Sequence, residues 1–95
     1  MLDQLTKESF LPRLNQTFRL TSVEPPLELR LIEVEARWGK GPTREPFSLV
    51  FAGPGAPVLP QSIYRLENDE MGALELFLVP IGRDAAGIRY EAAFN

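Results

Sequence analysis

The chain contains no cysteine and no histidine among its 95 residues. Without thiols it cannot form disulfide bonds, thiolate zinc sites, iron–sulfur clusters or a cysteine nucleophile. Without imidazoles it lacks the commonest general base and the commonest metal ligand of proteins. These absences predict that the protein is not an enzyme and has no cofactor, no metal site and no catalytic residue.

Long charged runs and long apolar runs are missing as well. Ten basic and thirteen acidic residues give a net charge of −3, and they are mixed along the chain, so no basic tract would neutralise nucleic-acid phosphates. No segment approaches the ~20 apolar residues that cross a bilayer, and residues 1–10 lack the pattern of a signal peptide. We expect a cytoplasmic protein that binds neither nucleic acid nor membrane.

The apolar content is sufficient for one small core, because 44% of the residues are hydrophobic and a chain of this length folds without disulfides. We expect a single all-β domain over residues 1–95. A short helix over residues 7–10 precedes the strands, since Thr6 can cap it and Pro12 stops it. One helical turn is not stable alone in water, so three apolar residues are expected to dock it: Leu5, Phe10 and Leu14.

From Gln16 onward the apolar residues recur at every second position, which is typical of half-buried strands. Tyr64 and Tyr90 fall on the buried phase. No interval would hold the crossover helix that parallel neighbours need, so the sequence predicts a small antiparallel six-stranded barrel or curled meander with a short N-terminal helix. A closed barrel of six strands is filled by its own side chains. The expected strands begin at Gln16 and then cover residues 27–38, 47–52, 61–67, 73–81 and 88–94.

Two of these strands are irregular. The apolar phase of residues 27–38 switches at Leu31 and Ile32, which predicts a β-bulge there. The strand over 73–81 is apolar on both faces, with Phe77, Val79 and Ile81 on the second one. The N-terminal helix is the expected cover for that second face.

Trp38 and a pair of carboxylates are the remaining candidates for a site. Trp38 ends its strand beside a glycine turn, and we expect its ring to cap the core, with a half-exposed ring as the alternative. Glu33 and Glu35 share one face, within the 5–9.5 Å range that glycosidase carboxylates span. A solvated charged ladder explains them better. Two short segments, 53–55 and 68–70, are interpreted as turns rather than as a phosphate loop and a calcium loop.

Several short segments stand out together: PFSLVF at 46–51, Gly53-Pro54, LPQ at 59–61, YRLE at 64–67, Gly72, LFLVPIG at 76–82 and the YEA and FN of 90–95. In these segments the chain resembles a family of small uncharacterised bacterial all-β domains. The resemblance spans nearly the whole chain and departs from the family where Asn15 and Ser62 stand in place of glycine. It implies no assigned activity and no catalytic residue, and for some members an association with phage-tail-like or tail-collar proteins.

These observations together predict a non-catalytic binding or structural module, accessory to a larger assembly such as a phage-tail-like particle. It would bind a protein partner or a second copy through an edge strand or an apolar face, with Trp38, Phe77 and Val79 as the partner-binding residues. The alternative is a small-ligand or carbohydrate-binding domain that uses Trp38 and the face of Glu33 and Glu35. A hydrolase that uses those two carboxylates is the third hypothesis.

Overall fold

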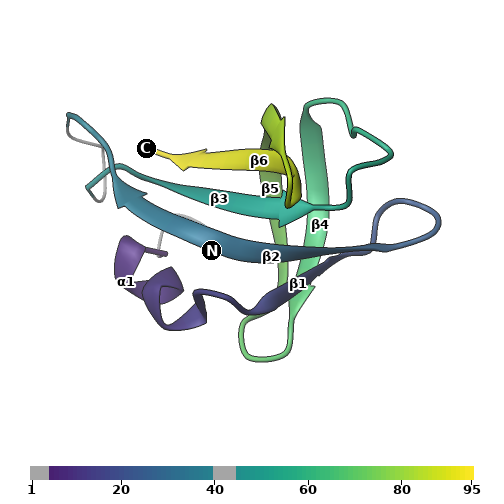
Figure 1. The fold of residues 1–95 in the computed structure, drawn as a ribbon. Helices are drawn as coiled ribbons and strands as arrows, with labels where there is room; N and C mark the ends of the chain where they lie inside the picture. The colour runs from purple at the N-terminus through teal and green to yellow at the C-terminus, as the bar shows by residue number, and fades with distance from the viewer. Residues whose placement is uncertain (1–4, 40–44) are drawn as a thin grey trace.

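The structure is a computed structural model that describes residues 5–39 and 45–95. It is mostly antiparallel β structure with a short N-terminal helix, as the alternation of apolar residues predicts (Figure 1). The elements, in chain order, are α1 (Lys7–Phe10), the 3-10 helix η2 (Leu11–Arg13), β1 (Thr17–Leu20), β2 (Leu27–Ala36), β3 (Phe47–Gly53), β4 (Ser62–Asn68), β5 (Gly72–Asp84) and β6 (Gly87–Phe94).

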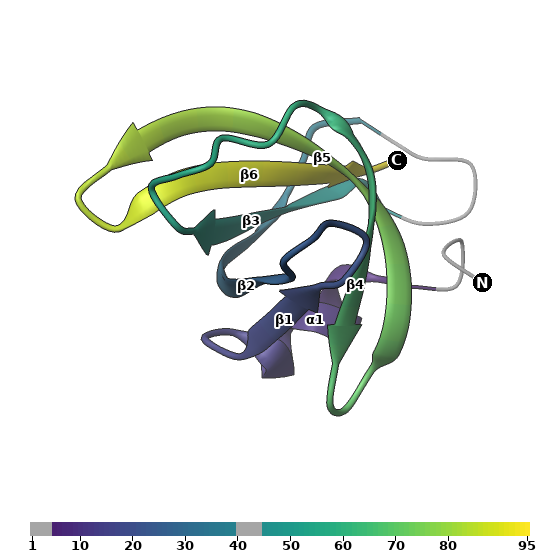
Figure 2. The same ribbon diagram turned by 90° about the vertical axis from the view of Figure 1, so that its right-hand side faces the viewer.

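The six strands form one sheet that closes into a ring in the order β1-β2-β3-β6-β5-β4. Every neighbouring pair is antiparallel. The closing contact is short: β1 meets β4 through Arg19 opposite Glu67 and Leu20 opposite Leu66. Because the first strand is paired with β2 and β4, and the last with β3 and β5, neither of them is left as an edge strand (Figure 2).

Bulges let two long strands bend around the ring. In β2 the register shifts between Leu31 and Glu33, which confirms the bulge that the phase switch predicts. In β5 the register shifts between Pro80 and Gly82. Residues 72–78 of β5 pair with β4, whereas residues 79–84 pair with β6, so one strand joins both halves of the sheet. Bulges increase local twist and bend, which is what closure of so small a sheet requires.

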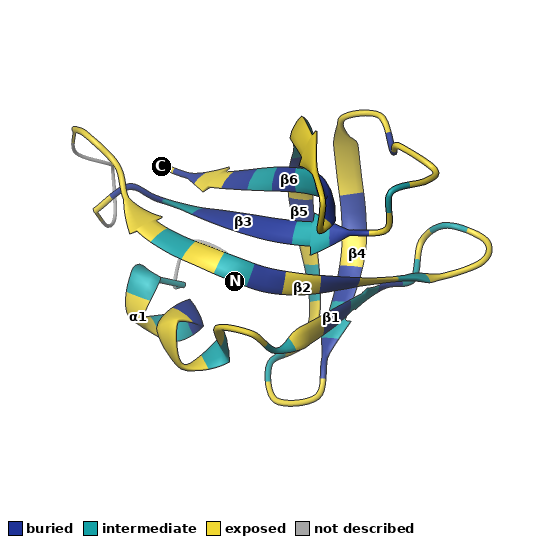
Figure 3. Cartoon of the chain, viewed as in Figure 1, coloured by how far each residue is buried: buried dark blue, intermediate teal, exposed yellow. Residues whose placement is uncertain are grey.

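The core fills the ring with side chains of the predicted phase, among them Phe18, Phe51 and Leu66, which are all fully buried. Buried and exposed positions alternate along much of the strands (Figure 3). Tyr64 and Tyr90 are buried as expected, and both hold the β3–β4 connection across one end of the ring. The hydroxyl of Tyr90 accepts a hydrogen bond from the Leu59 backbone N–H (3.0 Å), and the hydroxyl of Tyr64 donates to the carbonyl of Pro60 (2.5 Å). Buried tyrosines need such partners.

The opposite end of the ring is closed by α1. Ser9 completes the helix start, since its hydroxyl accepts a hydrogen bond from the Thr6 N–H (3.0 Å). The ring of Phe10 is fully buried, with its centroid 5.9 Å from that of Phe47 and 5.6 Å from that of Phe94. Phe47 and Phe94 stack on each other at 4.5 Å. These three rings form a cluster between the start of β3 and the end of β6.

This position of the helix corrects one expectation. The helix was expected to cover the second face of the strand at 73–81, but α1 packs against β2 and the end of the ring, and Phe77 stays half exposed. The reason is that Phe10 finds a fully apolar site between two other rings. Leu5 packs against the core as expected, whereas Leu14 is exposed and does not dock the helix.

We predict that Phe10→Ala destabilises the domain by about 3–5 kcal/mol, the usual cost of removing a buried phenylalanine. The measurement is the free energy of unfolding in urea, followed by circular dichroism. Leu11→Ala is the matched control: Leu11 is next in the chain but 40% exposed, so its loss should cost within about 0.5 kcal/mol. Equal effects of the two substitutions would contradict the assignment of Phe10 as the closing residue.

Candidate functional site

An apolar stripe runs along the outer face of β4 and β5. Ile63 lies directly opposite Phe77 in the β4–β5 ladder, and the two side chains are 64% and 52% exposed. Val79 is half-buried and Ile81 is half exposed further along β5. We call Ile63, Phe77, Val79 and Ile81 the outer stripe. The alternation that buries Leu76 and Leu78 places these residues on the other face.

Trp38 does not cap the core, which corrects the sequence-based expectation. Its side chain is fully exposed (101%). The phase of β2 does point inward at this position, but β2 ends at Ala36, opposite the first residue of β3, Phe47. The core is already closed there by Phe10, so nothing remains for the indole to cover. In strand order β3 and β6 separate β2 from β5, so Trp38 is not part of the outer stripe.

The two carboxylates singled out in the sequence lie on the outer face of β2. Glu33 and Glu35 are both exposed, and the Oε2 of Glu33 lies 3.7 Å from the Nη1 of Arg89 on β6. This is the solvated charged ladder that the alternation suggests. Over residues 5–39 and 45–95, no group of three or more aspartates and glutamates is placed to hold a metal ion.

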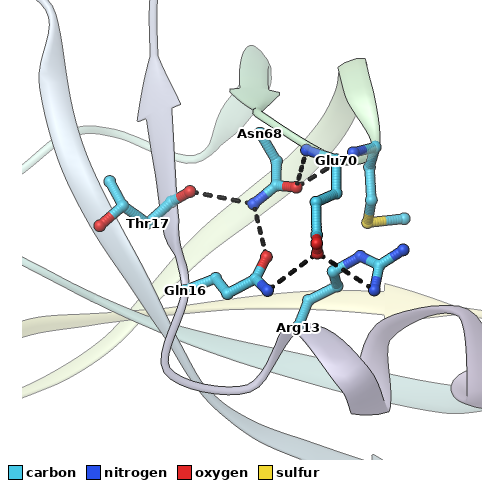
Figure 4. Close-up of polar contacts among 6 residues, drawn as sticks. Arg13, Gln16, Thr17, Asn68 and Glu70 are labelled. Carbon is cyan, nitrogen blue, oxygen red and sulfur yellow. Dashed lines mark hydrogen bonds and ion pairs between the residues drawn. The ribbon is translucent and has the colours of Figure 1, made fainter.

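A polar cluster surrounds Asn68, the single buried polar residue in the described part of the chain (Figure 4). Its Nδ2 donates to the Oε1 of Gln16 and to the carbonyl of Thr17, both at 3.1 Å. Its Oδ1 accepts from the N–H groups of Glu70 (2.9 Å) and Met71 (3.0 Å). Asn68 therefore shapes the β4–β5 turn and ties it to β1, and residues 68–70 form a turn as interpreted from the sequence.

Charged neighbours surround Asn68 and bind one another. The Oε1 of Glu70 accepts from the Nε2 of Gln16 (2.9 Å) and lies 3.3 Å from the Nη1 of Arg13. The Nη1 of Arg19 lies 3.3 Å from the Oδ1 of Asp69. The open groove here has a volume of about 460 Å³. These bonds between side chains link the turn before β1 to the β4–β5 turn.

A second, smaller hollow lies on the outer face of the β2–β3 hairpin, where β3 ends. It has a volume of about 290 Å³. Gly87 shapes it: its φ of +121° favours glycine, and a Cβ there would collide with the carbonyl of Gly53. This close approach brings the β5–β6 turn against the end of β3. We call this site the hairpin hollow, and it is lined by Thr17, Glu28, Leu29, Arg30, Ala52, Gly53, Pro54 and Ala86.

Comparison with known proteins places the chain in a family. The model of the family described as "Domain of unknown function (DUF6916)" matches residues 5–94. The chain belongs to this family. The match is consistent with the uncharacterised small domains that the sequence resembles, and it names no activity. A search of curated proteins and a search of solved structures found no match.

No helix within residues 5–39 and 45–95 is long and apolar enough to cross a membrane.

Substitution of Asn68 tests the link between turns. Asn68→Ala removes four hydrogen bonds of a buried side chain, so we expect the free energy of unfolding to fall by about 1–3 kcal/mol. Asp69→Ala is the control, since the neighbouring Asp69 side chain is 87% exposed and exposed ion pairs contribute at most about 1 kcal/mol. A smaller loss for Asn68→Ala than for Asp69→Ala, measured in urea, would count against the link.

Asp84 gives the domain a pH dependence. A side-chain hydrogen bond from Arg89, and then one from the backbone N–H of Ala86, lower the pKa of Asp84 below its ordinary value of 3.8. A carboxylate with a lowered pKa in the folded state contributes stability that is present above the unfolded pKa and is lost as pH falls through the folded pKa. We expect Asp84→Asn to make the decline of stability below about pH 4 shallower. Thermal unfolding across pH 2–6 measures this, and identical pH profiles for the two proteins would refute it.

Proposed function

We propose that this domain is a non-catalytic binding module whose partner face is the outer stripe. The observation that carries the proposal is the Ile63–Phe77 pair, which places two large apolar side chains opposite each other and more than half exposed. Val79 and Ile81 extend the pair along β5. Contiguous exposed apolar patches mark interaction sites more often than scattered residues do.

The surroundings of the stripe support a protein partner. Arg65 and Glu75 are opposite each other in the β4–β5 ladder, and Glu91 is opposite Val79 in the β5–β6 ladder. The apolar centre is therefore bordered by charges of both signs, which is the usual anatomy of a protein interface. Aromatic side chains such as Phe77 are enriched at the centres of such interfaces.

The interior of the domain argues for the same use of the surface. The core residues fill the ring, and the two ends are closed by Phe10 and by the connection that Tyr64 and Tyr90 hold. Binding would take place on the outside. We further propose that the partner belongs to a larger bacterial assembly, a phage-tail-like particle. This narrower part of the proposal is supported by the sequence resemblance alone.

A small-ligand or carbohydrate-binding domain is the second candidate, and the exposed indole of Trp38 favours it, since aromatic faces are common binding elements. The carboxylate of Glu33 contacts Arg89, which leaves Glu35 as the neighbouring acid. Titration of the Trp38 fluorescence with a panel of sugars tests this candidate. No change in emission would remove it.

The outer stripe is tested with particles purified from a host that carries this chain. We expect tagged wild-type protein to co-sediment with tail-like particles, and Ile63→Ser/Phe77→Ser to lose at least about tenfold in affinity, since buried interface anchors contribute 2 kcal/mol or more. Val58→Ser is the control, because Val58 is 50% exposed in the β3–β4 connection. Both variants should keep the wild-type circular dichroism spectrum.

Retention of the particles by the Ile63→Ser/Phe77→Ser variant would place the partner surface elsewhere. Absence of wild-type protein from purified particles would overturn the phage-tail part of the proposal and leave the stripe to be tested with other assemblies.

A further inference from the structure

Two complementary features lie at opposite ends of the β2–β3 hairpin. One is Trp38, the single tryptophan of the chain, whose ring is fully exposed. The residue before it, Arg37, is held by two hydrogen bonds. The N–H of Arg37 donates to the carbonyl of Pro46 (2.9 Å), and the Nη1 of Arg37 donates to the Oδ1 of Asn95 (3.1 Å). The other feature is the hairpin hollow beside Gly53.

We propose that Trp38 of one copy of this chain inserts into the hairpin hollow of a second copy, head to tail. The inference deepens the proposed binding function and rests on it, because it names a second copy as one partner. The hollow of about 290 Å³ is close to the lower limit of ~300 Å³ for small-molecule pockets. One indole ring suits a site of this size.

The lining of the hollow matches the chemistry of an indole. Ala52, Pro54 and Ala86 provide accessible apolar surface for the ring. Arg30 can stack its guanidinium on the ring face, and the carboxylate of Glu28 can accept the indole N–H. Within the described part of the chain, no hydrogen bond or ion pair engages the side chains of Glu28 and Arg30.

The charges beside Trp38 complement those of the hollow. Glu35 near the end of β2 and Arg37 just after it precede Trp38, and the hollow carries one charge of each sign, Arg30 and Glu28. Each charge of one copy therefore has an opposite charge available on the other. Complementary potentials of this kind fix the orientation of partners.

The separation of the two features decides how the copies assemble. Leu29 and Trp38 lie on one extended segment, so at ~3.3 Å per residue they are about 30 Å apart. A copy cannot fill its own hollow over that distance. Because the two surfaces differ, the contact repeats from copy to copy and produces a ring or a filament. A tryptophan buries about 150–250 Å², so the contact is small and needs high protein concentration.

The single tryptophan makes the contact directly measurable. One protein, the donor, supplies the tryptophan ring but cannot accept one. It is the Ala86→Phe variant, which keeps Trp38 and fills its own hollow from an exposed turn position. The other protein, the acceptor, supplies the hollow. It is the Trp38→Ala variant, which keeps the hollow and has no tryptophan emission of its own. Titration of the donor with the acceptor, from about 10 μM to about 1 mM, should shift the Trp38 emission to shorter wavelength and saturate at one to one.

Sedimentation velocity supplies the second measurement. Each variant alone should remain monomeric, their mixture should form dimers only, and the wild-type protein should form larger species as its concentration rises. Arg30→Glu with Trp38 retained is a second donor, in case Ala86→Phe does not fold.

Matched charge reversals in the acceptor provide the control. Trp38→Ala/Arg30→Glu should bind at least about tenfold more weakly than Trp38→Ala, a loss of ~1.4 kcal/mol. Trp38→Ala/Arg65→Glu should bind unchanged, because Arg65 is an exposed β4 residue outside the hollow.

Three results would overturn the inference. The first is a Trp38 emission that does not change when the acceptor is added. The second is an equal affinity for both charge-reversed acceptors. The third is an emission shift produced by sugars but not by the acceptor. A flat titration together with intact binding through the outer stripe refutes this inference alone. Loss of binding in the Ile63→Ser/Phe77→Ser variant does not alter the tryptophan titration, so the two proposals fail separately.

Discussion

The small circumference of the sheet is the constraint on which the rest of the structure depends. A ring of six strands encloses only enough space for its own side chains. Aromatic residues take much of that space: Phe18 and Phe51 meet edge to face at 5.2 Å in the interior. The open ends are then closed by different parts of the chain. Any binding must therefore use the outer faces of the strands, the hairpins or the turns.

The same constraint explains why β5 is long and bent. It pairs with β4 over its first half and with β6 over its second half, so it links the two halves of the sheet. Its outer face must pass over the bend, and that is where Phe77 and Val79 lie. A strand that curves outward spreads its outer side chains apart, which leaves apolar surface that the strand's own neighbours do not cover.

Local patterns in the sequence predicted much of this fold. The alternation around Leu76 and Phe77 separates the buried face from the exposed one, and the phase switch at Leu31 locates the bulge, because both signals depend on neighbouring residues alone. The packing site of the Phe10 ring could not be predicted in the same way, because its partners Phe47 and Phe94 are distant in sequence. The prediction for Trp38 was wrong because the apolar alternation of β2 continues in the sequence beyond Ala36, where the pairing with β3 ends.

The candidate sites show the same division between local and distant information. The turn at 68–70 is recognisable from its residues, but the bond from Asn68 to Gln16 joins positions 52 residues apart, and nothing local identifies that partner. The hairpin hollow is formed by β1, β2, β3 and the β5–β6 turn, so it exists only in three dimensions. In contrast, the outer stripe needs only one strand and its neighbour, and the sequence alone placed three of its four residues, Phe77, Val79 and Ile81, on one apolar face.

The contact of Phe10 with Phe94 has a consequence for biosynthesis. Phe10 emerges from the ribosome before Phe94, because proteins grow from the N-terminus. Until β6 has been translated, β3 and β5 lack the neighbour that joins them, and their apolar faces are open to solvent. The sheet can therefore close only after β6 has left the ribosome, since β6 joins β3 to β5.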